Sequence, residues 1–340
     1  MGPVTPLLAV LRKMRKLDPK LKFAWVGTPD GPEKDVIKNE GIPFYSISVA
    51  KFPRFISLRW GMFPFHYLRA RKQARRILET TSPYLVVSAG AFCSVPVFHE
   101  AFKRKIPCVT HQLDFTPGLA NKIMARWCTL VTTSFSYNES PFHEKDEQVT
   151  TPCRFADVPH PTVEEAKKRL GLDLRRRTVF IFGGGTGAGA LNEEVESIQK
   201  ELTDMAQIIH LTGKGKGEDQ KNDGYQSHPV FTESQMLNAY LSADVVVCRA
   251  GLGTISELSC LKKPAILVPI PRSHQEMNAK HMPFSVVEQN ELLGDSLRTE
   301  LGSLLKNETR AKKMGERAHK KLPTDDGSIL AKKWLKLLQK

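Results

Sequence analysis

Short apolar runs, each followed by a glycine-rich or polar segment, recur along the chain in the pattern typical of alternating strands and helices. The valines between Asp244 and Cys248 predict a strand that is buried on both faces of a parallel sheet. The ranges 179–182, 208–212 and 265–269 have the same character. We therefore expect a parallel α/β sheet in the second half of the chain.

The first half shows the same alternation but begins abruptly. A helical pattern at residues 7–16 follows the first residues directly, whereas a Rossmann-like half normally opens with a strand and a glycine turn. We expect this first strand and its glycine loop to be missing. Later apolar runs predict strands at residues 22–27, 41–49, 84–88, 107–110 and 130–133.

At 340 residues, the chain is long enough for two domains of ordinary size. The predicted fold is α/β, with two Rossmann-like domains facing each other across a cleft. The first domain is expected at residues 1–154, and a polar, proline-containing linker is expected at 155–161. The second domain is expected at 162–322, and a helix within 323–340 is predicted to pack back on the first domain.

Composition narrows the class of protein. A hydrophobic content of 41% and a charged content of 25% describe a soluble globular chain, with no apolar run of membrane-spanning length and no signal peptide. The six cysteines occur singly, without metal-ligand spacing, which favours a reduced cytoplasmic setting. Residues 1–154 contain 23 Lys and Arg against 12 Asp and Glu, so most of the net charge of +14 lies there. This imbalance indicates an anionic partner for the first half.

Residues 51–76 interleave large apolar side chains with eight Lys and Arg and contain no acidic residue. Aromatic and basic residues in alternation suit the anionic surface of a bilayer, where each basic residue adds roughly 1 kcal/mol. The alternative is a buried apolar face beside a solvated basic one. Nucleic-acid binding is not supported, because no nucleic-acid motif occurs. The residues expected to form the membrane patch are Phe55, Arg59, Trp60, Phe63 and Arg69.

A candidate phosphate site follows the strand at 244–248. Gly251 and Gly253 allow a tight turn, and Thr254 with Glu257 has the spacing of a helix-capping box. A strand, a glycine turn and a helix N-terminus together favour phosphate oxygens. The alternative is that Glu257 only caps its helix.

Polar segments follow three other predicted strands, and ligands bind at the carboxyl ends of strands in open α/β sheets. The run His274–Asn278 follows one strand, and the glycine-rich turn 183–192 follows another. That turn is not a Walker A motif and fits a dinucleotide fingerprint only loosely. Asp114 and His111 follow the strand at 107–110 and are candidates for acid–base work, with simple turn structure as the alternative.

Six segments resemble motifs of the bacterial MurG family. They are GAFCSVP (90–96), PCVTHQLDFTPGLANK (107–122), TPCR (151–154), GGGTGAGALN (183–192), CRAGLGTISEL (248–258) and HQEMNA (274–279). The resemblance covers nearly the whole chain in the right order. It implies a GT-B fold and transfer of N-acetylglucosamine to a lipid-linked muramyl-pentapeptide.

The resemblance also implies roles for single residues. Glu257 would bind the ribose hydroxyls, Arg154 and the backbone amides at 252–254 would bind the diphosphate, and 233–236 would lie beside the uracil. The implied donor-binding set is Arg154, Gly183, Gly184, Gly185, Thr186, Gly187, Glu233, Met236, Gly251, Leu252, Gly253, Thr254, Glu257, His274, Gln275 and Asn278. The implied acceptor set is Phe92, Ser94 and Asn192.

The chain also departs from the family pattern. Pro3 stands where the family's N-terminal glycine loop carries a His, and Asp114 replaces an Asn. Phe92 replaces a Tyr, and Gly185 replaces a Ser that meets phosphate. These departures make donor binding better supported than catalysis, and they leave Asp114, then His111, as the candidate general bases.

The sequence therefore predicts an inverting, metal-independent transferase without a cofactor. Its expected partners are UDP-N-acetylglucosamine, a polyprenyl diphosphate-linked acceptor and an anionic membrane surface, at the cytoplasmic face of the cell (inner) membrane. The alternatives are a related glycosyltransferase with another lipid acceptor, a non-catalytic nucleotide-sugar-binding scaffold, and a nicotinamide-dependent oxidoreductase. The last lacks a suitably placed acidic residue after a second strand.

Overall fold

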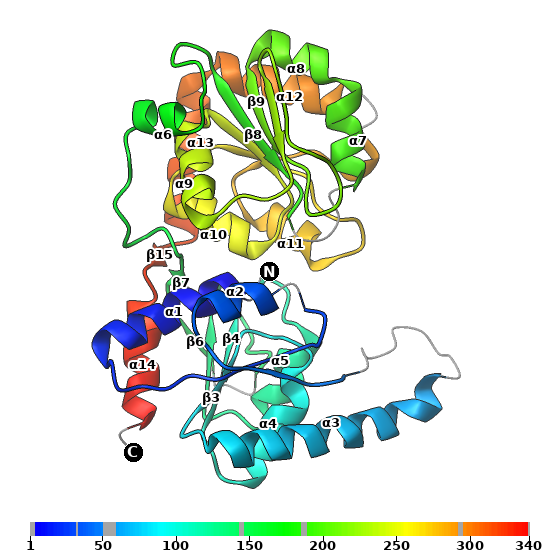
Figure 1. The fold of residues 1–340 in the computed structure, drawn as a ribbon, viewed down its shortest axis with the longest axis vertical. Helices are drawn as coiled ribbons and strands as arrows, with labels where there is room; N and C mark the ends of the chain where they lie inside the picture. Colours follow the sequence, from blue (N-terminus) through cyan, green and yellow to red (C-terminus); the bar gives the residue numbers. More distant parts are fainter. Residues whose placement is uncertain are drawn as a thin grey trace.

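The computed structural model has two α/β lobes, one above the other along the long axis of the molecule (Figure 1). It describes residues 4–31, 33–49, 59–142, 146–184, 189–291 and 295–338, with the backbone alone described at 59–63. The predicted fold class, α/β with parallel sheets in two facing domains, is confirmed.

The C-terminal lobe is built on a seven-stranded sheet with the order β10-β11-β9-β8-β12-β13-β14. Every pair is parallel except β10–β11. The central strands are buried along their whole length, as expected where helices cover both faces of a parallel sheet. The strands are β8 (Thr178–Phe182), β9 (Gln207–Leu211), β10 (Gln220–Asn222), β11 (Tyr225–His228), β12 (Val245–Cys248), β13 (Ala265–Leu267) and β14 (Ser285–Val286).

Helices cover both faces of this sheet (Figure 1). Two of them begin with capping boxes, in which Thr162 pairs with Glu165 and Thr232 pairs with Gln235. The helices are α6 (Val163–Arg169), α7 (Gly189–Ser197), α8 (Gln199–Met205), α9 (Glu233–Ser242), α10 (Leu252–Cys260), α11 (His274–His281), α12 (Ser296–Lys306) and α13 (Glu308–Lys321). A short 3-10 helix, η1 (Gln289–Glu291), follows β14.

In the N-terminal lobe, the strands form two parallel sheets, ordered β1-β2 and β3-β4-β5-β6. The same helical layers cover both sheets, because Val26 and Val86 pack into one apolar cluster and Phe23 and Leu85 into another. The strands are β1 (Trp25–Gly27), β2 (Phe44–Ser46), β3 (Val86–Ser88), β4 (Cys108–Gln112), β5 (Leu130–Thr133) and β6 (Asp146–Gln148). The helices are α1 (Val4–Leu17), α2 (Lys34–Asn39), α3 (Arg59–Thr81), α4 (Ser94–Lys103) and α5 (Leu119–Ala125).

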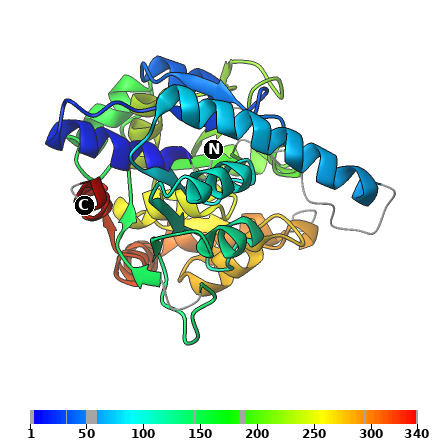
Figure 2. The same cartoon turned by 90° about the horizontal axis from the view of Figure 1, so that it is seen from below.

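The helix α3 extends away from the body of the N-terminal lobe (Figures 1 and 2). It carries Pro64 inside its first two turns, and Phe65 and Leu68 follow with exposed fractions of 74% and 57%. Within the part of the chain that the structure describes, no helix is both long and apolar enough to cross a membrane.

The chain returns to the N-terminal lobe at its end. The short strand β15 (Thr324–Asp325) pairs in parallel with β7 (Thr151–Pro152), and the helix α14 (Ser328–Leu338) then packs against α1. At the turn between them, Gly327 has φ +86°, and a Cβ there would lie 2.9 Å from the Val10 backbone. Only glycine allows this close approach.

An ion pair ties the two helices together. Lys13 of α1 donates a hydrogen bond to Asp326, which also accepts from the Ser328 backbone at the start of α14. Burial alone would raise the pKa of Asp326, but the hydrogen bonds from Lys13 and Ser328 outweigh it and lower the pKa to about 2. The ionised form of Asp326 is therefore favoured in the folded protein.

This lowered pKa predicts an acid-labile contact. The unfolded pKa is close to 3.8, so Asp326 contributes its stability above pH 4 and loses it as pH falls from about 4 to about 2. A depression of this size corresponds to about 2 kcal/mol in the free energy of unfolding. Urea unfolding followed between pH 2 and pH 7 should show this slope, and Asp326→Asn should remove it. An unchanged slope in Asp326→Asn would show that other groups cause it.

Candidate active site

The helix α10 presents backbone amides at the carboxyl end of β12. Its N-cap is Gly251, in extended conformation and without a side-chain cap, and the first intrahelical bond runs from Ile255 N to Gly251 O at 3.0 Å. The N–H groups of Leu252, Gly253 and Thr254 therefore lie ahead of the helical ladder. The capping box that the spacing of Thr254 and Glu257 predicts, with Thr254 as the N-cap, does not form, because Gly251 is the N-cap and the helix begins at Leu252. Because the helix begins at Leu252, the free amides of residues 252–254 lie at the N-terminus of α10, where an anion is favoured.

One turn along α10, Glu257 is buried beside an arginine and a tyrosine. The Tyr240 hydroxyl donates to Glu257 Oε2 at 2.8 Å, and Arg154 Nε lies 2.9 Å from Glu257 Oε1. The Arg154 N–H does not point along this line, so the contact is an ion pair without a hydrogen bond. Burial raises the pKa of Glu257, although the Arg154 charge and the Tyr240 hydrogen bond act in the opposite direction.

Arg154 also connects Glu257 to the first turn of α9. Its guanidinium lies over the Phe155 ring, 4.6 Å from the ring centroid, and 3.8 Å from Glu233 Oε2. Glu233 in turn pairs with Arg12 of α1 at 2.8 Å, which joins the two lobes on this side. Two carboxylates and the Arg154 guanidinium thus lie near the N-terminus of α10. A phosphate group bound there would compete with the carboxylates for the guanidinium.

A second contact between the lobes centres on Asn278 of α11, which is fully buried. Its Nδ2 donates to Asp114 Oδ1 at 2.9 Å and to Ala250 O at 3.2 Å, and its Oδ1 accepts from Phe115 N at 3.0 Å. The Phe115 ring also stacks on His281, with 3.4 Å between ring centroids. Asn278 therefore joins the turn before α10 to the loop after β4.

The buried side chain of Gln112, which is 2% exposed, forms hydrogen bonds with the loop that carries Asp114. Its Nε2 donates to Asp114 O at 2.7 Å and to Thr116 O at 3.2 Å. Its Oε1 accepts from Asn121 Nδ2 at 2.6 Å and from Gly118 N at 3.3 Å. These bonds fix the backbone from Asp114 to Gly118, and the Asp114 side chain is one-third exposed at 34%.

The structure gives His111 a different setting from Asp114. His111 is 1% exposed within β4, with Nδ1 3.0 Å from Thr132 Oγ1 and Nε2 3.5 Å from Ser134 Oγ. Burial lowers its pKa to about 4, so the ring is neutral at pH 7. Its two nitrogens face neighbouring strand residues.

The other predicted site residues of the C-terminal lobe differ in how exposed their side chains are. His274 has a half-exposed side chain with Nε2 3.8 Å from Asp114, and Gln275 accepts from Ile270 N at 3.2 Å. Met236 is half-buried against the C-terminal core. Asn192 is buried, donates to Thr212 O at 2.9 Å and lies 3.1 Å from His210 Nε2.

In the N-terminal lobe, Ser94 begins α4 and accepts from Ser88 Oγ at 2.9 Å, and Phe92 lies half-buried just before it. In the C-terminal lobe, Gly183 and Gly184 follow β8, and Gly184 adopts φ +73°. Several predicted positions lie outside the description: Gly185, Thr186, Gly187 and Phe55 entirely, and Arg59, Trp60 and Phe63 in their side chains. Arg69 is exposed on α3.

The sequence did not reveal three contributors to this site: Tyr240, Gln112 and Arg12. Tyr240 lies three residues after Leu237 on the buried face of α9, and this helical spacing indicates only a core residue. Gln112 directly follows a residue that had been singled out, and its position at a strand end was the available signal. Arg12 had no local signal, because its partner Glu233 lies 221 positions away.

Comparison with known proteins shows the family of this chain. The glycosyltransferase family 28 N-terminal domain matches residues 1–133, and the family 28 C-terminal domain matches residues 178–327. A Clostridium perfringens UDP-N-acetylglucosamine–N-acetylmuramyl-(pentapeptide) pyrophosphoryl-undecaprenol N-acetylglucosamine transferase is 35% identical over 90% of this chain and 88% of its own length. The Bacillus subtilis protein of the same name is 30% identical over 93% and 91%. The chain belongs to the MurG family of glycosyltransferases.

Solved structures agree with this membership at the level of the fold. Acinetobacter baumannii MurG superposes with a TM-score of 0.72 at 23% identity, covering 98% of this chain and 96% of that one. The glycosyltransferase SnogD from Streptomyces nogalater gives 0.70 at 14% identity, covering 99% and 96%. The α10 amides, Arg154 and Glu257 of this MurG-family chain therefore lie within a glycosyltransferase fold.

The buried hydrogen bond to Glu257 gives a prediction for stability. Tyr240→Phe removes the hydroxyl that solvates a buried carboxylate, so we expect the free energy of unfolding to fall by about 1.5–3 kcal/mol. Chemical denaturation of the purified variant measures this. Tyr84→Phe is the matched control, since Tyr84 is 83% exposed, and it should leave stability unchanged. Equal stability of the two variants would mean that the Tyr240 hydroxyl does not support Glu257.

Proposed function

We propose that this MurG-family chain transfers N-acetylglucosamine from UDP-N-acetylglucosamine to a lipid-linked muramyl-pentapeptide, the lipid I to lipid II step of peptidoglycan synthesis. The names of its relatives describe this transfer, and the chain is 30–35% identical to those cited above. The observation that carries the proposal is the grouping of free α10 amides with Arg154 and Glu257. In this grouping, the amides and Arg154 would bind a diphosphate, and the Glu257 carboxylate would bind hydroxyl groups.

In the proposed complex, the diphosphate lies at the amides of Leu252, Gly253 and Thr254. Arg154 turns from Glu257 to the phosphate oxygens, because a guanidinium binds phosphate in a bidentate manner. Glu257 then accepts hydrogen bonds from the ribose hydroxyls, and residues 233–236 border the uracil. This exchange is supported by the imperfect Arg154–Glu257 contact, which lacks an aligned hydrogen bond.

The remaining donor-site residues surround the transferred sugar. We propose that His274 and Gln275, on the first turn of α11, contact the sugar hydroxyls. Asn278 follows on the next turn, where its fully buried amide holds the two lobes together through Asp114, Ala250 and Phe115. The glycine turn at 183–187 adds backbone amides to the diphosphate site. The UDP leaving group is then stabilised by helix-end amides and Arg154 rather than by a cofactor.

The proposed general base is Asp114. It removes the proton from the acceptor hydroxyl, whose oxygen attacks the anomeric carbon as the bond to UDP breaks, with inversion at that carbon. Asn278 and Gln112 hold Asp114 from its side chain and from its backbone. His111 is buried and faces Thr132 and Ser134, so the proposal gives the base role to Asp114 alone.

The acceptor is proposed to reach the cleft from an anionic membrane surface. Phe92, Ser94 and Asn192 would line its path, and the membrane patch at 51–76 would dock the N-terminal lobe. Two residues of α3 support this docking, because Phe65 and Leu68 expose 74% and 57% of their surface on a helix that leaves the body. The protein would then act as a peripheral protein at the cytoplasmic face of the cell (inner) membrane.

The proposed chemistry is tested with Asp114→Asn. Loss of a general base typically costs a factor of about 10²–10⁴ in turnover, and we expect a fall of that size. Donor affinity should stay within about threefold, because the amide keeps the shape of the carboxylate. Steady-state transfer assays and calorimetric titration with UDP-N-acetylglucosamine measure the two quantities. Asp295→Asn, whose side chain is exposed, is the matched control.

Near-normal turnover in Asp114→Asn would refute its role as the base. In the same titrations, UDP-N-acetylgalactosamine and NADH should bind far more weakly than UDP-N-acetylglucosamine. Binding of NADH alone would support an oxidoreductase. Donor binding without any transfer to lipid acceptors would support a non-catalytic scaffold.

The docking is tested with Phe65→Ser combined with Leu68→Ser. Burying each of these side chains in a bilayer gains about 1.5–3 kcal/mol, so the double variant should bind anionic vesicles at least tenfold more weakly. Val163→Ser combined with Leu174→Ser is the matched control, since both residues are exposed on the C-terminal lobe. Co-sedimentation that falls equally in both pairs would argue against docking through α3.

A further inference from the structure

Two free cysteines from distant parts of the chain lie together behind the candidate donor site. Cys153 directly follows β7, where the chain passes between the lobes, and Cys260 is the last residue of α10. Both pack into the apolar cluster that fills the C-terminal lobe. Cys153 is only 2% exposed, whereas Cys260 is half-buried and can be reached from solvent.

The short strand β15 brings the two cysteines together. It pairs with β7 so that Thr324 lies opposite Thr151, and the pairing continues to a hydrogen bond from Cys153 N to Asp325 O at 2.8 Å. The helix α10 packs against β15, and the Thr324 hydroxyl donates to the Cys260 sulfur. One strand therefore contacts Cys153 through its backbone and Cys260 through a side chain.

The two thiols also form a hydrogen bond with each other, in which Cys153 donates to Cys260. This bond raises the pKa of Cys153, and burial acts in the same direction. The same bond lowers the pKa of Cys260, although burial acts against it. Since the thiolate is the nucleophilic form of cysteine, the half-buried Cys260 is the thiol that reacts first with a small reagent.

Each cysteine is adjacent to a side chain of the proposed donor site. Arg154 directly follows Cys153 in the chain, and Glu257 precedes Cys260 by three residues, about one turn of α10. Arg154 Nε and Glu257 Oε1 are 2.9 Å apart. A covalent link between the cysteines would therefore lie immediately behind the Arg154–Glu257 ion pair.

We propose that Cys153 and Cys260 are a modification site, at which a low-molecular-weight disulfide oxidises the two thiols to one intramolecular disulfide, and that this bond weakens donor binding. The second part of the inference rests on the proposed donor site. The first part does not, because the two thiols meet without any ligand.

The reaction is a thiol–disulfide exchange, written here with oxidised glutathione. The Cys260 thiolate attacks one glutathione sulfur, and the first glutathione leaves as a thiolate. The Cys153 sulfur then attacks the Cys260 sulfur of this mixed disulfide, and the second glutathione leaves as a thiolate. The protons of the two cysteine thiols pass through water to the two glutathione thiolates. The two cysteines are thus oxidised to one disulfide, and one glutathione disulfide is reduced to two glutathione thiols.

The new bond would restrain the two parts of the donor site that must adjust to a ligand. A covalent link holds the sulfur atoms closer together than a hydrogen bond between thiols, so β7 and the last turn of α10 would approach and stay joined. In the proposed complex, Arg154 turns from Glu257 to the diphosphate. Because small displacements of binding groups have large effects, we expect the affinity for UDP-N-acetylglucosamine to fall at least about tenfold.

Formation of the bond is tested by treating the unmodified protein with oxidised glutathione. Mass spectrometry of unreduced peptides should find Cys153 joined to Cys260, and dithiothreitol should restore both thiols. In Cys153→Ala, glutathione should remain attached to Cys260, because the second thiol is absent. Glutathione that remains attached to Cys260 of the unmodified protein, or a Cys260 that does not react, would overturn the proposal.

The effect on the donor site is tested by calorimetric titration with UDP-N-acetylglucosamine before and after oxidation. The unmodified protein should lose affinity and regain it with dithiothreitol, whereas Cys260→Ala should keep its affinity throughout. Cys128→Ala is the matched control, since Cys128 is buried in the N-terminal lobe, and it should respond like the unmodified protein. Unchanged affinity of a protein in which the bond has been mapped would refute its effect on donor binding.

These outcomes also separate the cysteine pair from the proposed function. If the reduced protein does not bind UDP-N-acetylglucosamine, the donor site and its control by the pair are both refuted. If the reduced protein binds the donor but oxidation does not join Cys153 to Cys260, only the modification site is refuted. Both comparisons use the unmodified protein, so neither depends on whether a variant folds.

Discussion

The site depends on one buried amide. Asn278 donates to Asp114 of the N-terminal lobe and to Ala250 of the C-terminal lobe, and it accepts from the Phe115 backbone. A fully buried amide must satisfy its hydrogen bonds, so these three partners hold the two lobes at one spacing. The loop after β4 and the turn before α10 therefore meet at a common point between the lobes, where the Asp114 side chain is one-third exposed.

That spacing has consequences in both lobes. The turn before α10 sets where the helix begins, and the start at Leu252 leaves three amides ahead of the helical ladder. In the N-terminal lobe, the Gln112 side chain fixes the backbone from Asp114 to Gly118 with three hydrogen bonds, and the Asn121 side chain donates a fourth to Gln112. The proposed diphosphate site and the proposed base are thus positioned by two separate sets of hydrogen bonds, and Asn278 connects the two sets.

Sequence patterns predicted the strands and helices whose formation depends on neighbouring residues in the chain. The apolar runs at 179–182 and 244–248 became central strands, because a strand covered on both faces must be apolar throughout. The predicted capping box at Thr254 and Glu257 does not form, because the Glu257 carboxylate interacts with Tyr240 and Arg154 instead of with its own helix. The spacing within one helix could not show these partners from elsewhere in the chain. The partnership of Asn278 with Asp114 spans 164 positions, and no periodic pattern encodes such a contact.

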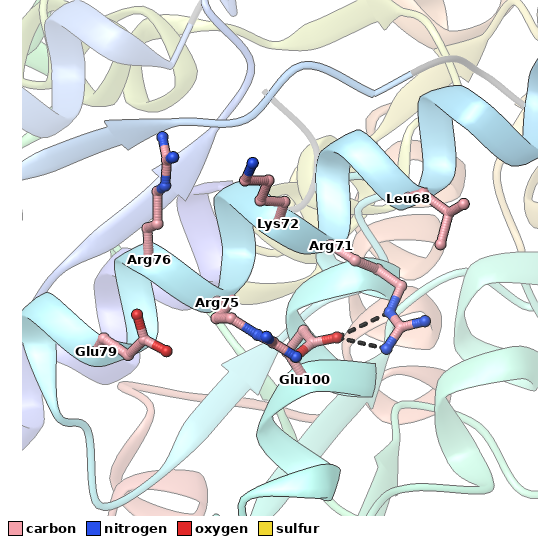
Figure 3. Close-up of a pocket in the computed structure, with 7 residues that line it drawn as sticks. All are labelled: Leu68, Arg71, Lys72, Arg75, Arg76, Glu79 and Glu100. Atoms are coloured by element: carbon pink, nitrogen blue, oxygen red, sulfur yellow. Dashed lines mark hydrogen bonds and ion pairs between the residues drawn. The ribbon is translucent and has the colours of Figure 1, made fainter.

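The two buried carboxylates Glu100 and Glu257 differ in how far neighbouring groups compensate their charge. Glu100 is bonded by Arg71 and Arg104, with Arg75 nearby, and the arginines lower its pKa despite burial. Glu257 has one arginine without an aligned hydrogen bond, and burial raises its pKa. The charge of Glu100 is compensated within the protein, and its ion pair with Arg71 ties α4 to α3 (Figure 3). The charge of Glu257 is compensated only in part, which leaves acceptor capacity for the hydroxyl groups of a ligand.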